Sequence, residues 1–311
     1  MSDRVDKAVQ AVLNDGMSER AASRKFKVDR GNLRMRLKDK KISYLQDRIE
    51  EVKECSAKFP EGTLLLYDIH IPHQDIVAVD SAIKYAKAHY EIREIILGGD
   101  TMDCESLSKY DKISDTASFA DEVYATNSFL RKLRDIFPKA KITYIMGNHE
   151  ERLEKYIRKN APELADFKEL TLPSFLDFDD IVGGVEFVDN RKRLTQGLGP
   201  YKVQGWNIFH GHEFGICPLT NPAKRYVDRA KVNMITGHIH KTDSSVITTF
   251  NRDLIRCYSV GTLAKLSPDY MPINQWTQGF AVIEHVYADA TSWRTPLGIV
   301  HNHLIWYGEV Q

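Results

Sequence analysis

The sequence predicts an α/β protein preceded by a small, separate helical module. Three apolar runs have the length of buried strands, at residues 64–67, 95–97 and 142–146, and the second and third contain β-branched residues. Each run is followed at once by Gly or Asp and then by further polar residues. Before the first run, apolar residues recur at helical spacing. We therefore expect a helical module, a helical linker and one large α/β domain, at residues 1–41, 42–60 and 61–311.

The start of the chain predicts three short helices. Residues 15–17 contain a Gly and break the first apolar pattern. Ser18 and Asp29 are the expected N-caps of the second and third helices, because their side chains can accept bonds from free backbone N–H groups. The apolar residues that define the three helices are Val5, Val9, Val12 and Leu13, then Ala21, Ala22 and Phe26, then Leu33, Met35 and Leu37.

Positive charge is concentrated in the same region. The whole chain has 43 Lys and Arg against 43 Asp and Glu, yet residues 17–41 have 10 basic against 3 acidic side chains. A basic stripe along a helix is a common electrostatic signature of nucleic-acid binding. The alternative is a solvated, basic three-helix bundle that serves packing or dimerisation.

The stretch MSERAASRKFKVDRGNLRMRLK resembles the pipsqueak-type helix-turn-helix motif. In such a pair the second helix enters the major groove, and small alanines in the first helix permit close packing. The resemblance implies DNA as a partner. It places four candidate DNA contacts at the start of the third predicted helix: Arg30, Asn32, Arg34 and Arg36.

Residues 42–58 form a charged, amphipathic stretch that predicts a helix between the two parts. Further along, longer helical patterns predict helices at residues 118–137, 151–160 and 221–231. Short apolar runs predict strands at residues 184–188, 201–209, 246–250, 254–260 and 279–285. Residues 286–311 are aromatic and strand-like, and they carry no recognisable chemistry.

Five short polar blocks carry the chemistry that the sequence offers. They are, in order, Asp68-Ile69-His70, Gly99-Asp100-Thr101-Met102-Asp103, Gly147-Asn148-His149-Glu150, His210-Gly211-His212 and Gly237-His238-Ile239-His240. The first three blocks follow the three predicted strands. Open α/β sheets bind ligands at the C-terminal ends of their strands, so we expect these blocks to meet at one site.

The residue types in these blocks suit two divalent metal ions. Two ions roughly 3.5–4 Å apart can clamp the attacking and leaving oxygens of a phosphoryl group and lower the pKa of bound water. Mixed Asp, Asn and His ligands favour borderline first-row metals over Mg²⁺ or Ca²⁺. We expect Mn²⁺, with Fe, Zn or Ni as the alternatives.

In this order the five blocks resemble the signature of the calcineurin-like metallophosphoesterases, across residues 63–286. The resemblance implies a four-layer α/β/β/α sandwich of two mixed sheets. It also implies that a hydroxide bridging two metal ions hydrolyses a phosphoester. Matched position by position, it implies seven metal ligands: Asp68, His70 and His240 for one ion, Asn148, His210 and His238 for the other, and Asp100 bridging both.

The resemblance further implies that His149 protonates the leaving group or steadies the transition state. The pKa of such a histidine is tuned by a neighbouring carboxylate, for which Asp103 and Glu150 are the candidates. One part of the family pattern is missing. Asp103-Cys104-Glu105 stands where phosphoprotein phosphatases have Asp-Arg-Gly, which counts against a Ser/Thr protein phosphatase.

Three further residues are candidates for substrate contact. Arg152 could hold a phosphate bidentately or could be a solvated charge on its helix. His73 follows the first block closely enough to line the pocket. His212 could also contact substrate, or it could replace His210 as the metal ligand of the fourth block, although family spacing favours His210.

Composition adds broad limits. No apolar run approaches eighteen residues and no signal peptide opens the chain, so we expect a cytoplasmic protein without a membrane partner. The four cysteines lack Cys-x-x-Cys spacing and are expected to be reduced, mostly packed thiols.

Three functions fit these observations. The first is a nuclease or DNA-directed phosphodiesterase, which would use both the metal ligands and the basic module. The second is a phosphoesterase for nucleotides or other small phosphate esters, with residues 1–41 used for assembly. The third is a DNA-binding regulator whose metal site is inert. We favour the first, because an abandoned site has no physical reason to keep seven ligands and His149, and because residues 1–41 suit DNA.

Overall fold

The structure is a computed structural model that describes residues 2–13, 17–38, 59–109, 117–215, 220–268, 271–287 and 297–311. The chain divides into two compact units, Met1–Lys58 and Phe59–Gln311. The predicted linker helix at residues 42–58 lies outside the described residues. Within the described ranges, no helix combines the length and the apolar content that a membrane crossing requires.

The described residues of the N-terminal unit form three helical segments: α1 (Ser2–Leu13), α2 (Glu19–Phe26) and residues 30–38. Their buried side chains form one small apolar core: Val5, Ala8, Val9, Ala22 and Leu33. Ala22 is fully buried, which permits the close helix packing that its size predicts. Met35 instead is 58% exposed. It lies roughly 200° around the helix from both Leu33 and Leu37, and therefore on the solvent side.

Side-chain caps begin the second and third helical segments. Ala21 N donates to Ser18 Oγ at 3.3 Å, and Asn32 N donates to Asp29 Oδ1 at 2.9 Å. Both predicted N-caps are therefore confirmed. α2 ends at Lys27, whose φ of 53° is left-handed and whose backbone N–H donates to Ser23 O. These bonds fix the short turn between α2 and the third segment.

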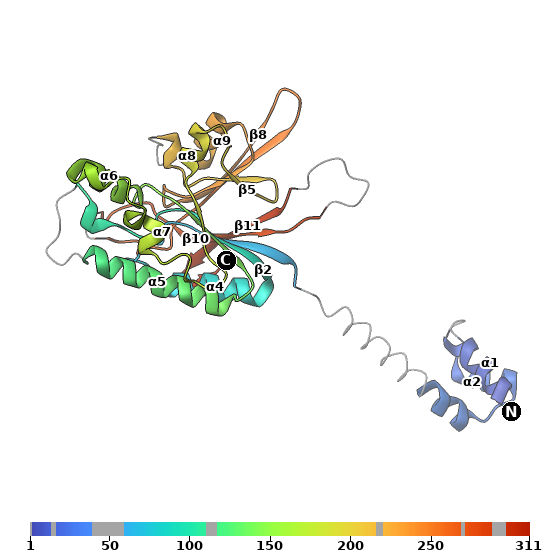
Figure 1. Cartoon of the computed structure of the whole chain (residues 1–311). Coiled ribbons are helices and arrows are strands. Elements are labelled where there is room, and N and C mark those ends of the chain that lie inside the picture. Colours follow the sequence, from blue (N-terminus) through green and yellow to red (C-terminus); the bar gives the residue numbers. More distant parts are fainter. Residues whose placement is uncertain are drawn as a thin grey trace. The chain divides into compact units, whose positions relative to one another are not determined.

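The larger unit is built on two mixed sheets. The first has the strand order β12-β11-β10-β1-β2-β3-β4; Figure 1 labels its strands β2, β10 and β11. Strands β1 to β4 run parallel, whereas β10, β11 and β12 pair antiparallel with their neighbours. The bounds are Glu61–Leu66 (β1), Glu91–Leu97 (β2), Lys141–Ile145 (β3), Glu186–Val188 (β4), Gln278–Glu284 (β10), Ile299–Trp306 (β11) and Glu309–Val310 (β12).

The second sheet has the order β5-β6-β7-β9-β8, with parallel β6, β7 and β9 between antiparallel edge strands. One predicted strand is wrong here: residues 201–209 form a hairpin. Gln204 and Gly205 both have positive φ, 45° and 79°, and reverse the chain in a two-residue turn. The bounds are Tyr201–Val203 (β5), Trp206–Ile208 (β6), Met234–Thr236 (β7), Thr242–Thr248 (β8) and Leu254–Val260 (β9).

Both faces of the first sheet are buried, which explains its continuous apolar strands. In β1, Leu64 and Leu66 pack into a core with side chains of α4 (Ile76–His89) and α5 (Phe119–Ile136). The alternate residues Leu65 and Tyr67 pack with β6, β7 and β9 of the second sheet. A third apolar cluster joins β7 and β9 to α9 (Pro222–Ala230), on the opposite side of the unit from α4 and α5 in Figure 1.

The three predicted helices of the larger unit are confirmed as α5, α6 and α9, to within one residue at each end. α5 begins at a capping box formed by Ser118 and Asp121. α4 was not predicted; its buried stripe contains the small residues Ala78, Ala82 and Ala86, so its apolar pattern is faint. The remaining helical elements are α6 (Glu151–Asn160), α7 (Leu172–Phe175), α8 (Asn190–Thr195), η1 (Glu105–Leu107), η2 (Pro162–Leu164), η3 (Lys168–Leu170) and η4 (His212–Phe214).

The predicted α/β class is confirmed at the level of two mixed sheets with helices. Two of the four cysteines are described, Cys104 and Cys257. Both are buried and reduced, as their spacing predicted. Cys55 and Cys217 lie outside the described residues.

Candidate metal centre

The five polar blocks converge at one edge of the two sheets. Parallel β1, β2 and β3 end at the first three blocks, and parallel β6 and β7 end at the fourth and fifth. Backbone bonds hold neighbouring blocks together, for example His70 N to Asp100 O at 2.9 Å and Gly237 N to His210 O at 2.9 Å. Parallel strands present their C-terminal ends on the same side, so the blocks meet as predicted.

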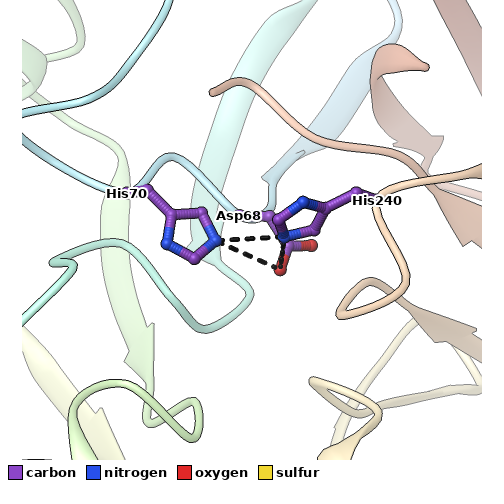
Figure 2. A group of neighbouring side chains, drawn as sticks. All are labelled: Asp68, His70 and His240. Carbon is purple, nitrogen blue, oxygen red and sulfur yellow. Dashed lines mark hydrogen bonds and ion pairs between the residues drawn. The ribbon is translucent and has the colours of Figure 1, made fainter. Parts of the chain in front are cut away.

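The first group of possible ligands is Asp68, His70 and His240, whose side chains point toward one another in Figure 2. The two Nε2 atoms lie 3.0 Å apart. Asp68 Oδ1 lies 3.3 Å from His240 Nε2 and 4.0 Å from His70 Nε2. All three residues are buried. Ligand atoms about 2.1 Å from one metal ion lie roughly 3–4 Å from each other, so this group could hold one ion.

The second group is Asp100, His210 and His238. His210 Nε2 lies 3.2 Å from Asp100 Oδ2 and 3.2 Å from Asn148 Oδ1. The predicted amide ligand therefore joins this group. Asp100 Oδ2 also lies 4.0 Å from His70 Nε2 of the first group. One oxygen of Asp100 thus faces both groups, which is the position that a bridging ligand requires.

Asp68 and Asp100 each use one carboxylate oxygen to accept a backbone hydrogen bond, and the other oxygen faces the candidate ligands. Asp68 Oδ2 accepts a bond from His238 N at 2.8 Å, and Asp100 Oδ1 accepts one from His149 N at 2.9 Å. The other oxygen of Asp68 is buried and makes no hydrogen bond of normal geometry with the described residues. A buried carboxylate oxygen left in this way is costly unless a cation meets it. The arrangement therefore fits metal ions.

Two imidazoles are oriented from behind so that Nε2 faces the centre. His70 Nδ1 lies 2.6 Å from Asp103 Oδ1, and His210 Nδ1 lies 3.1 Å from Gly98 O. Both partners are acceptors, so each Nδ1 donates a hydrogen to its partner and Nε2 is the nitrogen left to bind an ion. This is the usual support for metal-binding histidines, in which an outer carboxylate or carbonyl fixes the tautomer.

Electrostatics at the centre favour positive charge. Burial would lower the pKa of His210, but Asp100 and Asp68 outweigh it and raise that pKa to about 10. Burial and the charge of His210 lower the pKa of His238 to about 3. Burial disfavours the carboxylate of Asp100, yet His149 and His210 hold its pKa well below the usual range. The carboxylates are thus ionised and poised to attract cations.

The backbone of the ligand loops is unusual. Five residues of the centre have left-handed φ, between 50° and 70°: Asp68, His70, Asp100, His238 and His240. Non-glycine residues in this region cost on the order of 1–3 kcal/mol each, and such positions gather at functional sites. The loops also require Gly147, because a Cβ there would lie 2.2 Å from Asp100 Oδ1 and 2.9 Å from Glu150 Oε2.

Glu150 fastens the loops rather than tuning His149. Its buried carboxylate accepts hydrogen bonds from four backbone N–H groups and one hydroxyl. The donors are the backbone N atoms of Asp100, Thr101, Met102 and Gly147, and the hydroxyl of Tyr144. The second block is therefore tied directly to the third. Of the two carboxylates predicted to tune His149, Glu150 is not the one in contact with its ring.

Asp103 is the carboxylate beside His149. His149 Nδ1 lies 3.0 Å from Asp103 Oδ1 and 2.8 Å from Asp103 O. Burial would lower the pKa of His149, but Asp100 and Asp103 raise it. Arg152 Nη2 lies 2.9 Å from His149 Nε2, and Arg152 Nη1 donates to Asp103 O at 2.9 Å. The Arg152 side chain is 20% exposed and contacts Asp103 and His149, so it is not a solvated charge on its helix; phosphate binding by Arg152 stays a prediction.

The other two candidate substrate residues lie around the ligand groups. His73 is exposed and pairs with Glu105, at 2.9 Å between Nε2 and Oε2. His212 Nε2 lies 3.0 Å from Glu151 Oε1. Among the described residues it is therefore His210, not His212, that groups with Asp100 and His238. Substrate contact by His73 or His212 stays a prediction.

The four candidate DNA contacts share one helical segment of the N-terminal unit. Arg30, Asn32, Arg34 and Arg36 are all exposed. Arg34 Nε pairs with Glu19 Oε2 of α2 at 2.7 Å. The remaining positive side chains are thus presented to solvent, where they could reach phosphates.

The chain matches no protein-family model and no curated protein. Two residues beside the candidate ligands make contacts that the sequence did not predict. Asp103 was named only as a possible neighbour of His149, yet it also orients His70. Glu151 was not singled out, and it pairs with His212, Lys155 and Arg191.

Proposed function

We propose that the protein is a binuclear-metal-dependent phosphoesterase of the calcineurin-like type. The observation that carries the proposal is the position of Asp100, whose Oδ2 faces both groups of buried ligand atoms. Two groups that share one carboxylate suit a pair of ions, and a pair of ions suits phosphoryl transfer. The order of the five blocks along the chain supports the same family.

The finer fold follows from this proposal. We assign the larger unit to a four-layer α/β/β/α sandwich, in which α4 and α5 lie outside one sheet and α9 lies outside the other. The three apolar clusters support that assignment, because they occupy the three spaces between four layers. We likewise assign residues 1–41 to a helix-turn-helix, supported by the three capped or packed helical segments.

Seven residues would hold the ions: Asp68, His70, Asp100, Asn148, His210, His238 and His240. Bound ions of this kind act as Lewis acids and lower the pKa of water. His149 lies beside Asp100 and would give a proton to the leaving oxygen. Asp103 holds its imidazole by Nδ1. Arg152 Nη1 donates to Asp103 O, and Arg152 Nη2 lies 2.9 Å from His149 Nε2. Arg152 would therefore orient His149 or a phosphate oxygen.

The ligand set favours Mn²⁺, with Fe, Zn or Ni as alternatives. Four imidazoles and an amide beside two carboxylates form a mixed nitrogen and oxygen set. Such a set suits borderline first-row metals better than Mg²⁺ or Ca²⁺, which prefer oxygen ligands. The substrate that we propose is a phosphodiester of nucleic acid, since exposed basic side chains gather on the N-terminal unit.

A substrate panel tests the proposal. The full chain loaded with Mn²⁺ is expected to hydrolyse bis(4-nitrophenyl) phosphate and at least one nucleic-acid substrate, to lose both activities with a chelator, and to regain them with Mn²⁺. The panel compares single- and double-stranded DNA, RNA, cyclic nucleotides and 4-nitrophenyl phosphate. If the Mn²⁺-loaded chain cleaves none of these esters, the proposed function is wrong. Cleavage of only the small esters would favour the small-molecule alternative.

Removing residues 1–41 is expected to separate the two activities. The larger unit has its own cores, so it should stay folded and should still cleave bis(4-nitrophenyl) phosphate. Activity on long DNA should fall, because phosphate contacts dominate nonspecific DNA affinity. Binding of the full chain should also show a log–log salt slope several units steeper than that of the shortened chain. DNA binding and turnover, measured across salt concentrations, provide the comparison.

A charge-reversal variant gives the matched control. Changing Arg30, Arg34 and Arg36 together to Glu should reproduce the loss on DNA, because these side chains are exposed. Reversing three exposed lysines of the larger unit should have much less effect: Lys84, Lys87 and Lys139. Equal DNA affinity and equal salt slope for the full and shortened chains would exclude the N-terminal unit as the DNA-binding part.

A further inference from the structure

Trp276 lies against the metal centre without belonging to either ligand group. Its indole ring meets the imidazole of His240 edge-on, with ring centroids 4.3 Å apart and an interplanar angle of 71°. The residue is only partly buried and lies next to a candidate metal ligand. Any phosphoester held at His240 would therefore have this indole within reach of one of its substituents.

The loop that carries Trp276 is fixed by hydrogen bonds. Asn274 Nδ2 donates to Leu266 O at 2.6 Å and to Met271 O at 2.9 Å, while its Oδ1 accepts from Trp276 N at 2.9 Å. The next residue, Thr277, donates from its N to His240 O at 2.9 Å. An aromatic side chain on a loop already held in place loses little conformational freedom when it binds a ligand.

The same loop presents other apolar groups to solvent. Ile273 is 93% exposed and Met271 is 42% exposed. Close to them, Lys241 directly follows His240 and donates to Gln275 Oε1 at 3.2 Å. The loop that carries Trp276 thus combines an indole beside His240 with exposed apolar side chains and a nearby positive charge. It matches a ligand that combines a flat apolar group with a phosphate.

We propose that Trp276 is a stacking platform for a nucleobase attached to the scissile phosphate. The inference rests on the proposed phosphoesterase function and narrows its substrates to nucleoside phosphodiesters. Base–aromatic stacking is effective and tolerant of base identity, because every base has a π face. The indole would thus select a nucleoside on the phosphate without selecting a sequence. A role limited to packing against His240 would not distinguish one ester from another.

Two diesters with the same leaving group test the proposal: thymidine 5′-(4-nitrophenyl phosphate) and methyl 4-nitrophenyl phosphate. The Mn²⁺-loaded full chain is expected to favour the thymidine ester in kcat/KM by roughly 5- to 100-fold. Trp276→Ala should remove most of this preference through KM, and Trp276→Phe should keep much of it. For both variants the kinetics on the methyl ester should stay close to wild type. Trp306→Ala, at an exposed tryptophan of β11, is the matched control and should change neither ester.

Three other outcomes of this experiment would show that Trp276 does not bind the nucleoside. If the wild type shows no preference, or if Trp276→Ala keeps it, the indole does not bind the nucleoside, and the phosphoesterase proposal still stands. If Trp276→Ala loses metal and slows both esters equally, the indole only supports His240. If the Mn²⁺-loaded wild type cleaves neither ester nor any other phosphoester, the proposed function fails and this inference fails with it.

Discussion

Replacing Asp100 by asparagine is expected to abolish hydrolysis and to lower the bound metal by about half or more. Asp100 Oδ2 lies 3.2 Å from His210 Nε2 and 4.0 Å from His70 Nε2, so loss of its charge weakens both groups of ligands at once. The fold should survive, because an asparagine oxygen can still accept the bond from His149 N that Asp100 Oδ1 accepts at 2.9 Å. Turnover of a chromogenic diester and metal content per chain are the measurements.

Asp228→Asn provides the same chemical change away from the centre. Asp228 is a partly exposed residue of α9 that pairs with Lys224, so its variant should keep full activity and both metals. Surface pairs of this kind contribute little to stability. Near-wild-type turnover of the Asp100 variant with both metals bound would show that Asp100 does not bridge two ions.

Replacing His149 by alanine is expected to reduce turnover by roughly 10²- to 10⁴-fold on substrates with a poor leaving group, with both metals retained. His149 is held by Asp103 and lies 3.7 Å from Asp100 Oδ2, beside the metal groups but not among the seven proposed ligands. A good leaving group such as 4-nitrophenolate needs less protonation. Its ester should therefore lose less activity than an alkyl ester or DNA.

His89→Ala is the control for this variant, because His89 is an exposed histidine at the end of α4. Its kinetics should match the wild type on both kinds of ester. Equal losses in the His149 variant on good and poor leaving groups would assign His149 to orientation of the substrate or the loops. Loss of metal in that variant would assign it to the ligand set.

Much of the larger unit could be predicted because its strands are buried on both faces. Residues 64–67, 95–97 and 142–146 are predicted as strands from their apolar content and length, and polar blocks mark where each strand ends. The clustering of those blocks then follows from parallel pairing. The hairpin at residues 201–208 could not be read in the same way. Gln204-Gly205 is a weak turn signal between two apolar runs, so they merged into one predicted strand.

The contacts that could not be predicted from the sequence are those between side chains that only the tertiary fold brings together. Asp103 is the last residue of the second block, but only the tertiary structure brings it to both His70 and His149. Arg152 has the spacing of an exposed helical charge, yet it folds back onto the carbonyl of Asp103. Trp276 stands 36 positions after His240, at no spacing that would connect it to the centre. Such contacts carry no periodic signal.

Glu150 has a consequence for how the centre receives its ions. By accepting five hydrogen bonds, its carboxylate joins the loop after β2 to the loop after β3 into a single rigid piece. The ligand loops are therefore ordered when the protein folds, and binding an ion costs little further conformational entropy. A preassembled chelator of this kind can exchange one first-row ion for another while the polypeptide stays native. The identity of the bound ion would then depend on which metals are available and on their Irving–Williams order of affinity, as well as on the geometry of the site.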